Sequence, residues 1–447
     1  MNNRVRIGAG AGFQGDRLDP ALVLAERGEL QYLGLECLGE RTVALAQLRR
    51  RKDPAKGYDP LLERRMSRLL PLAKRQGMRI VTNMGAANPV AAADAVVAIA
   101  REQGIPVKVA IVSGDDVLRE IRLDAPTMEA RGRIGDYGAP ISANAYLGIE
   151  ALLPALHTGA DVVITGRVAD PSLFLAPIAY RFGWSPDDFD RLARGTCVGH
   201  LLECAGQLTG GYFVDPGRKD VSNMAWLGFP FADVDADGNA VFGKVEGTGG
   251  ALSLANTKEQ LLYEVNDPHA YVTPDVIADF SCVDLTVAGP QRIAVAGARG
   301  NDRPRQLKVS VGYHAGFVGE GEIGYAGRNA IARARLAGDI IRERLEGQFA
   351  EMRVELIGST SLHGPGFDRD EHPYEVRLRV AARALTPESA AIVGEEVEAL
   401  YTNGPAGGGG TRKYVHEQIG IVSTRIDRER VRSAVTVREW SPHAETV

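Results

Sequence analysis

The alternation of short apolar runs with helical patterns over the first 185 residues constrains the fold of this chain most. Each run is rich in β-branched or aliphatic residues and ends in a polar or glycine-rich turn. The runs are residues 5–7, 32–38, 79–82, 107–112 and 161–165. Strands that alternate with helices form right-handed βαβ units around a parallel sheet. We therefore expect an α/β fold, with a mostly parallel open sheet and flanking helices.

The pattern of predicted strands and helices changes after Trp184. Residues 186–193 predict a short helix, 235–239 a hairpin turn, and 328–344 a long amphipathic helix, while 320–327 is merely glycine-rich. The tail shows strand, strand, helix and strand signals in succession. These signals lie at residues 352–357, 374–381, 387–401 and 419–426.

A chain of 447 residues is too long for one typical core. We expect a parallel α/β domain at 1–185 and a mixed α/β domain at 186–345 that completes the site. A small α+β unit at 346–447 follows.

Composition excludes several classes of partner. The net charge is −5 and the isoelectric point is near 6.0, so nothing indicates binding to nucleic acid or to an anionic membrane. The four cysteines show no C-x-x-C spacing, which indicates reduced thiols. No apolar run approaches the length of a membrane span. We expect a cytoplasmic protein.

The turn after the strand at 161–165 carries a cation and an acid. Arg167 leaves the strand at its carboxyl end, and Asp170-Pro171 is typical of a helix start. In open α/β sheets, ligands bind beyond the carboxyl ends of the strands. Arg167 and Asp170 are therefore candidates for the site. The alternative is a capping Asp170 beside a surface Arg167.

A helix is also predicted to open at 142–148 and to run to about residue 156. Polar residues follow strands or open helices elsewhere in this first part of the chain. Each alone is more often a cap, but together they would line one edge of the sheet. The substrate-binding candidates are Asn83, Asn88, Ser113, Asp115 and Asn144. Asp16, in the turn after the first strand, and Thr248, in the glycine cluster 247–250, complete this set.

His200, Glu203 and Cys204 have helical spacing, three and four residues apart. A His–Glu pair can carry out acid–base chemistry, because a carboxylate shifts the imidazole pKa. Cys204, which lies among apolar residues, is better explained as a buried thiol. A metal site would need a third ligand, and H-E-x-x-H does not occur, so we expect no metal. Residues 264–271 are also dense in polar side chains, but Asp-Pro there is typical of a turn.

Gly10, Gly12 and Gly15 match the G-x-G-x-x-G pattern, and Glu36 stands near the place of a ribose-binding acid. In that motif the glycines should adjoin the helix N-terminus. Here the helix is predicted to start only at Asp19-Pro20. A general ligand-facing loop is favoured, and an NAD(P)-dependent oxidoreductase stays an alternative. The sequence requires no cofactor.

Four motifs occur in order along the chain: GAGAG at 8–12, TNMGAANP at 82–89, TGRVADP at 165–171, and HLLEC at 200–204 followed by Gly206-Gln207. With this set the chain resembles the acyclic terpene utilisation protein A family, long catalogued as a domain of unknown function. The resemblance covers about residues 4–430.

The resemblance implies a role in the bacterial breakdown of citronellol- and geraniol-type acids. The namesake has been proposed to act on a branched hydroxy-acyl-CoA, as a lyase that releases acetate. Relatives often have a small ferredoxin-like partner or C-terminal domain. This chain ends too early for the fused form unless its tail, 346–447, takes that part.

The favoured hypothesis is a lyase or hydratase of carboxylic-acid or acyl-CoA catabolism. Arg167 would hold a substrate carboxylate by a bidentate contact, and His200 or Asp170 would move the proton. Three asparagines would fix polar groups or an enolate oxygen; they are Asn83, Asn88 and Asn144. A non-catalytic ligand-binding subunit with a small partner is a further alternative. We expect a homo-oligomer whose ligand is a small carboxylate or acyl-CoA.

Overall fold

The computed structural model describes residues 4–129, 132–364 and 373–442. The chain forms two compact units, one made of Met1–Gly312 with Ile421–Val447 and the other of Tyr313–Gly420. We call them unit 1 and unit 2 and describe each by itself. The domain boundaries expected at residues 185 and 345 stay a prediction, because compactness alone does not test whether a segment folds independently.

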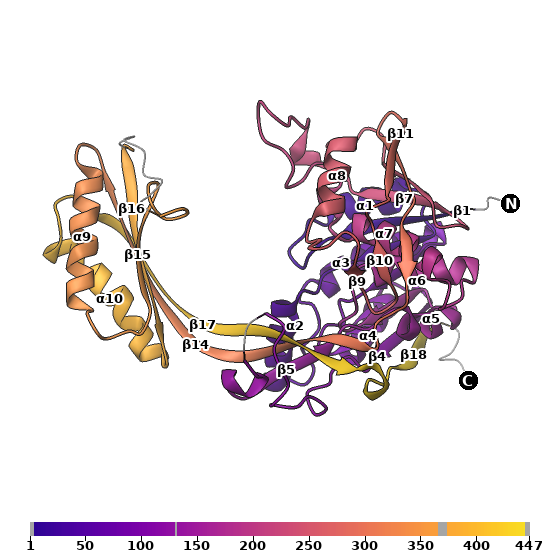
Figure 1. Cartoon of the computed structure of the whole chain (residues 1–447), viewed down its shortest axis with the longest axis horizontal. Helices are drawn as coiled ribbons and strands as arrows, with labels where there is room; N and C mark the ends of the chain where they lie inside the picture. Colours follow the sequence, from indigo (N-terminus) through magenta and orange to yellow (C-terminus); the bar gives the residue numbers. More distant parts are fainter. Residues whose placement is uncertain (1–3, 130–131, 365–372, 443–447) are drawn as a thin grey trace. The chain divides into compact units, whose positions relative to one another are not determined.

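The centre of unit 1 is a set of parallel strands, as the alternating pattern predicts (Figure 1). In spatial order they are β1 (Arg4–Ala11), β2 (Tyr32–Leu35), β3 (Arg79–Thr82), β6 (Val162–Thr165) and β4 (Val107–Ser113). The strand β6 is last in sequence among these five but lies between β3 and β4. The turn that carries Arg167 is therefore flanked by the turns of both neighbours.

Antiparallel strands extend this centre on both sides, so the large sheet is mixed. In the described part of the chain it has ten strands. Beyond β1 lie β7 (Pro230–Asp235), β8 (Ala240–Lys244), β12 (Arg292–Ala296) and β11 (Asp284–Gly289), and beyond β4 lies β18 (Ala434–Trp440). The α/β class is confirmed, and the predicted hairpin joins β7 to β8.

Two groups of helices pack against this sheet. The first contains α1 (Asp19–Arg27), α3 (Leu62–Gln76) and α4 (Pro89–Glu102). The second contains α5 (Ile149–His157), α6 (Ser172–Phe182) and α7 (Phe189–Glu203). Two further helices, α2 (Glu40–Lys52) and α8 (Leu254–Leu262), lie near the site described below. A continuous apolar core joins the helices to the strands.

Two predicted helix boundaries in unit 1 are wrong. The helix expected at 186–193 continues to Glu203, because the glycines inside it serve close packing. A side chain at Gly199 would collide with the carbonyl of Pro171. The helix expected to open at 142–148 begins only at Ile149. The preceding residues form the strand β5 (Pro140–Ala145), which pairs with β14.

Unit 2 alternates strands and helices in the order β-α-β-β-α-β, the ferredoxin-like arrangement. Its elements are β14 (Gln306–Ala326, which begins in unit 1), α9 (Ala330–Arg344), β15 (Met352–Ile357), β16 (Glu375–Ala384), α10 (Pro387–Asn403) and β17 (Gly409–Asp427). The strand order is β15-β16-β14-β17, and both helices pack on the sheet (Figure 1).

The elements predicted for the tail are confirmed within one or a few residues, apart from β17, which starts ten residues earlier than expected. All but the last residue of the glycine-rich stretch 320–327, by contrast, belongs to the long strand β14. Its glycines give α10 room to approach the sheet, since a side chain at Gly321 would lie 2.7 Å from Val397.

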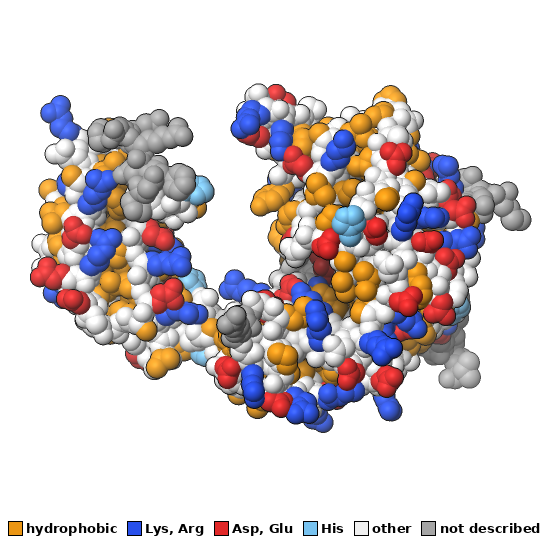
Figure 2. Space-filling model, in the orientation of Figure 1, with side chains coloured by type: hydrophobic (Ala, Val, Ile, Leu, Met, Phe, Trp, Pro, Cys, Tyr) orange, Lys and Arg blue, Asp and Glu red, His pale blue; other side chains and the backbone are white. Residues whose placement is uncertain are grey.

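The surface mixes both signs of charge. On the visible face, basic and acidic side chains alternate with apolar patches (Figure 2). Among the described residues, no helix combines the length and apolarity needed to cross a bilayer.

Candidate active site

A pocket of about 210 Å³ lies in unit 1 beside the turn that follows β6. Its polar lining residues are Glu40, Tyr146, Arg167, Asp170, Glu264, Tyr271, Thr273, Gln306 and Lys308, and its apolar ones include Pro171, Val272 and Leu307. A lining that combines charged groups with apolar side chains suits a small ligand with a polar end and a hydrocarbon part.

Three turns meet behind this pocket. The carboxylate oxygen Oδ2 of Asp115 accepts hydrogen bonds from the backbone N–H of Arg167, at 2.9 Å, and from the side-chain amide of Asn144, at 2.8 Å. Asp115 follows β4, Asn144 ends β5 and Arg167 follows β6. The convergence expected for these three residues is therefore present, and Asp115 positions the Arg167 turn.

Arg167 is a buried cation, with only 2% of its surface exposed. Its Nη1 donates to the carbonyl of Leu38 and lies 2.8 Å from Asp170 Oδ1. Its guanidinium also stacks on the ring of Tyr146, 4.1 Å from the centroid. Its Nε is buried and has no hydrogen-bond partner within the described residues. One edge of the guanidinium is thus held by the protein, and its Nε N–H lacks an acceptor.

Tyr146 and Glu40 connect a second cation, Lys308, to Arg167. The Tyr146 ring lies between Arg167 and Lys308, whose Nζ is 4.8 Å from the centroid. The Tyr146 hydroxyl donates to Glu40, and Lys308 Nζ lies 3.2 Å from the same carboxylate. Burial alone would raise the pKa of Glu40, but Arg167, Tyr146 and Lys308 outweigh it and lower that pKa to about 2. Glu40 is therefore ionised at neutral pH.

Other carboxyl groups near Arg167 have the opposite shift. Burial raises the pKa of Asp170, which Arg167 opposes and Glu40 reinforces. Burial and the charge of Asp170 raise the pKa of Glu36 to about 8, and burial raises that of Asp115 to about 6. Acids of this kind hold or exchange a proton near neutral pH, as acid–base chemistry requires.

His200 and Glu203 form the predicted pair, with Nδ1 and Oε1 2.9 Å apart. The other nitrogen, Nε2, contacts the carbonyl of Leu261 at 3.1 Å and must donate to it, because a carbonyl only accepts. Burial lowers the pKa of His200 to about 4, so its ring is neutral and Nδ1 is an acceptor. The proton in the pair then belongs to Glu203, whose pKa is raised well above its usual value by burial.

This pair does not line the pocket. His200 is 1% exposed and packs against Tyr271, with the ring centroids 5.0 Å apart. Tyr271 in turn lines the pocket. His200 and Glu203 therefore lie behind a lining residue, whereas Asp170 lines the pocket itself.

Two of the predicted asparagines form hydrogen bonds that stabilise the fold. Asn83 accepts from the backbone N–H of Cys37 and donates to Glu36. Asn88 caps α4 and donates to the carbonyls of Pro54 and Lys56. The pocket lining does not include either residue. Their predicted contact with substrate stays a prediction without geometric support.

Three further candidates lie away from this pocket. Ser113 faces the edge strand through the carbonyl of Ala434, 3.4 Å away. Asp16 accepts from the backbone N–H of Gly12 and fixes the glycine loop. Thr248 donates to the carbonyl of Val245 within its own turn.

The first glycine loop differs from a dinucleotide-binding turn. Gly10 lies inside β1, and α1 begins only at Asp19, so its first amides lie well beyond Gly12 and Gly15. A Cβ on Gly12 would lie 2.5 Å from the backbone of Cys204. Gly12 thus allows the loop to pack against α7, and this explains the glycine without a nucleotide.

Sequence reasoning missed Glu40, Tyr146, Glu264, Tyr271 and Lys308. They come from segments distant in the sequence, and the sequence of a strand such as β5 gives little sign of which strand it will pair with. One signal was available, because 264–271 is dense in polar side chains. Glu264 also adopts φ of 58°, which a residue other than glycine rarely does without a reason.

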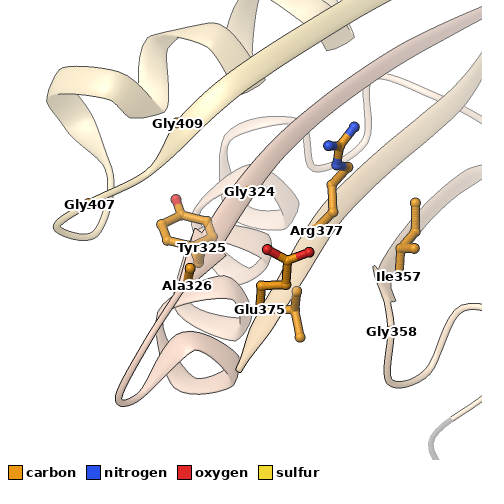
Figure 3. Close-up of a pocket in the computed structure, with 10 residues that line it drawn as sticks. Gly324, Tyr325, Ala326, Ile357, Gly358, Glu375, Arg377, Gly407 and Gly409 are labelled. Atoms are coloured by element: carbon orange, nitrogen blue, oxygen red, sulfur yellow. The ribbon is translucent and has the colours of Figure 1, made fainter. Parts of the chain in front are cut away.

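Across residues 4–129, 132–364 and 373–442, no group of three or more His, Cys, Asp and Glu side chains is arranged to hold a metal ion. Unit 2 contains a second hollow, of about 400 Å³ (Figure 3). Glu375 and Arg377 of β16 project over it, beside Gly324 of β14 and Ile357 of β15.

These features define a mixed α/β protein with a charged pocket beside the carboxyl ends of its central parallel strands. The family model for the acyclic terpene utilisation family protein AtuA matches residues 5–437, and the chain belongs to this family. No curated protein and no solved structure matches the chain.

Proposed function

We propose that this protein is an enzyme of carboxylic-acid or acyl-CoA catabolism, a lyase or hydratase that acts on a branched hydroxy-acyl substrate. Family membership supports the broader role in acyclic terpene utilisation. The pocket supports the narrower proposal, because its lining combines a cation, a carboxyl group whose pKa is raised by burial, and apolar side chains.

The observation that carries the proposal is the unpartnered Nε of Arg167. A buried polar group without a partner destabilises the fold by about 1–3 kcal/mol, and more when it is charged. A substrate carboxylate or thioester oxygen in the pocket would accept from this N–H. Such an acceptor is what the protein itself does not supply at this position.

Asp170 is placed to move the proton. As a carboxylate it would remove a proton from the carbon next to the acyl group. The electron pair of that C–H bond forms the double bond while the C–O bond to the hydroxyl breaks. Asp170 then returns the same proton to the departing hydroxide, which leaves as water, so atoms and charge balance.

The test is turnover of a branched 3-hydroxy-acyl-CoA, followed by mass spectrometry for loss of water or cleavage of a carbon–carbon bond. We expect Asp170→Asn to lower turnover by about 10²-fold or more. Substrate binding should persist. A variant that turns over substrate like the wild type would rule out Asp170 as the proton carrier.

Oligomerisation and a small ferredoxin-like partner remain part of the proposal. The β-α-β-β-α-β order of unit 2 supports the idea that the chain supplies such a unit itself. Light scattering of the purified protein tests for a homo-oligomer. Activity that appears only after addition of a small neighbouring protein would favour a separate partner.

A further inference from the structure

We propose that Tyr271 is the residue that recognises the hydroxyl group of the substrate, and that His200 and Glu203 are its positioning residues. The inference rests on the proposed function, since it names the oxygen contact within the same pocket. It assigns to the His200–Glu203 pair an indirect role in place of direct proton transfer.

The ring of Tyr271 is fixed from two directions. It belongs to β9 (Tyr271–Val272), which pairs with β10 (Ile277–Asp279). His200 packs against the ring at 5.0 Å, and Phe280 stacks on it at 5.0 Å with an interplanar angle of 25°. A ring held in this way loses little further freedom when its hydroxyl binds a ligand.

Among the hydroxyl groups that line this pocket in the described residues, that of Tyr271 is available to bind a ligand. Of the other lining hydroxyls in the described residues, that of Tyr146 donates to Glu40 and that of Thr273 to the carbonyl of Val276. No hydrogen bond joins the Tyr271 hydroxyl to another described residue. Burial raises the pKa of this phenol, so it keeps its proton and donates.

Arg167 and Tyr271 thus offer two donors to one ligand. The Arg167 Nε suits an acyl or carboxylate oxygen, and the Tyr271 hydroxyl suits a second oxygen further along the same acyl chain. Asp170 lies next to Arg167 in the same lining. A 3-hydroxy acid presents these two oxygens on carbons two positions apart, which makes it the class of substrate the pocket would select.

The experiment compares two acids of the same carbon skeleton, 3-hydroxy-3-methylbutanoate and 3-methylbutanoate, by calorimetric titration of the full-length protein. We expect the wild type to bind the hydroxy acid about 3- to 10-fold more tightly, the value of one hydrogen bond. Tyr271→Phe should bind both acids equally, with the affinity that the wild type has for 3-methylbutanoate. Tyr180→Phe, which removes a hydroxyl outside the pocket, is the matched control.

The outcomes separate the inference from the proposed function. If Tyr271→Phe keeps the preference for the hydroxy acid, or if the wild type shows none, the assignment of Tyr271 is wrong while carboxylate binding stands. If the wild type binds neither acid, the proposed function fails and the inference fails with it.

A second pair of variants tests the positioning residues. Glu203→Gln keeps a neutral donor toward His200 Nδ1 and should retain the preference for the hydroxy acid. Glu203→Ala removes the donor and should reduce that preference toward one, with little change in the affinity for 3-methylbutanoate. Equal behaviour of the two variants would show that Glu203 does not act through His200 and Tyr271.

Discussion

Arginine and glutamate side chains are used differently in the two units. On the sheet of unit 2, Arg379 lies 2.9 Å from Glu320 and 3.0 Å from Glu355, and Arg377 lies 2.9 Å from Glu322. These pairs are partly exposed and joined by hydrogen bonds. In unit 1 the buried Arg167 has an unpartnered Nε and faces a carboxyl whose pKa is raised. Matched charges indicate structure, whereas buried and incompletely matched charges indicate a site.

Cavity size alone does not single out the candidate site. The hollow in unit 2 is about twice as large as the pocket in unit 1, at about 400 Å³ against about 210 Å³. Gly324, Gly358, Gly407 and Gly409 contribute to its lining (Figure 3). Much of that volume is therefore the space that absent side chains leave, and it needs no ligand to explain it.

The largest expected difference between the units comes from removing one arginine in each. Arg167→Met should lower the free energy of unfolding by about 3–5 kcal/mol, because it leaves Asp170 and Glu40 without their buried cation. Arg379→Met should lower it by about 1 kcal/mol or less, since its partners stay hydrated. Urea titrations of both variants measure this, and equal losses would contradict the distinction.

The next largest effect concerns the proton on Glu203. Glu203→Ala should lower the free energy of unfolding by about 1–3 kcal/mol, because Nδ1 of the buried His200 loses its donor. Glu203→Gln should lower it by less than about 1 kcal/mol, since an amide also donates. Nitrogen NMR of His200 should show the ring protonated on Nε2. A ring protonated on both nitrogens at neutral pH would refute the neutral pair.

Glu36 and Glu320 should change stability with pH in opposite directions. The pKa of Glu36 is raised to about 8 in the folded protein from 4.5, so the folded state binds the extra proton and stability falls as pH rises from 4.5 to 8. Glu36→Gln removes this fall while keeping an acceptor for Asn83. The free energy of unfolding of Glu36→Gln should exceed that of the wild type by a margin that grows as pH rises from 4.5 to 8, by about 1.4 kcal/mol for each unit of pKa shift.

For Glu320, the hydrogen bond from Arg379 lowers the pKa. Its contribution is present above pH 4.5 and disappears as pH falls through the folded pKa. Glu320→Gln should therefore be slightly less stable than the wild type at neutral pH, by under about 1 kcal/mol, and equal to it in acid. Denaturation at a series of pH values measures both variants. Slopes of the same sign would break the comparison.

The smallest effect is expected in the larger hollow. Gly324→Ala places a methyl group 3.4 Å from the carbonyl of Gly409, an ordinary contact. Stability should change by about 0.5 kcal/mol or less. Binding of the carboxylic acids described above should not change. A clear loss of binding would show that the hollow in unit 2, too, takes part in ligand recognition.

The local sequence pattern predicts much of the fold but little of the pocket. The strands near 5–7, 79–82 and 161–165 were predictable because fully buried parallel strands are short apolar runs. The predicted helix ends ten residues before α7 does, because a glycine in the sequence can mark either a helix end or a position of close packing. The strand β14 was missed for the same reason, since its glycines make room for α10.

The turn at Arg167 and Asp170 was predictable, because strand ends of a parallel sheet gather at one edge. Its partners were not, since Lys308 reaches Tyr146 only through the pairing of β5 with β14. The substrate contact predicted for Asn83 lacks geometric support for a related reason. A polar residue after a strand is equally able to bind a ligand or a neighbouring turn, and only the position of Glu36 decides between them.

The antiparallel pairing of β18 with β4 bears on how the molecule forms during synthesis. Trp440 pairs with Val107 and Ala434 with Ser113, so the edge of the large sheet is completed by residues more than 320 positions later in the chain. All residues of unit 2 leave the ribosome before β18 does. The strands that unit 2 pairs with one another are all synthesised before β18, while β4 still has one edge uncovered. We therefore expect a nascent intermediate with unit 2 formed and the edge of β4 open, the stage at which a chaperone would matter most.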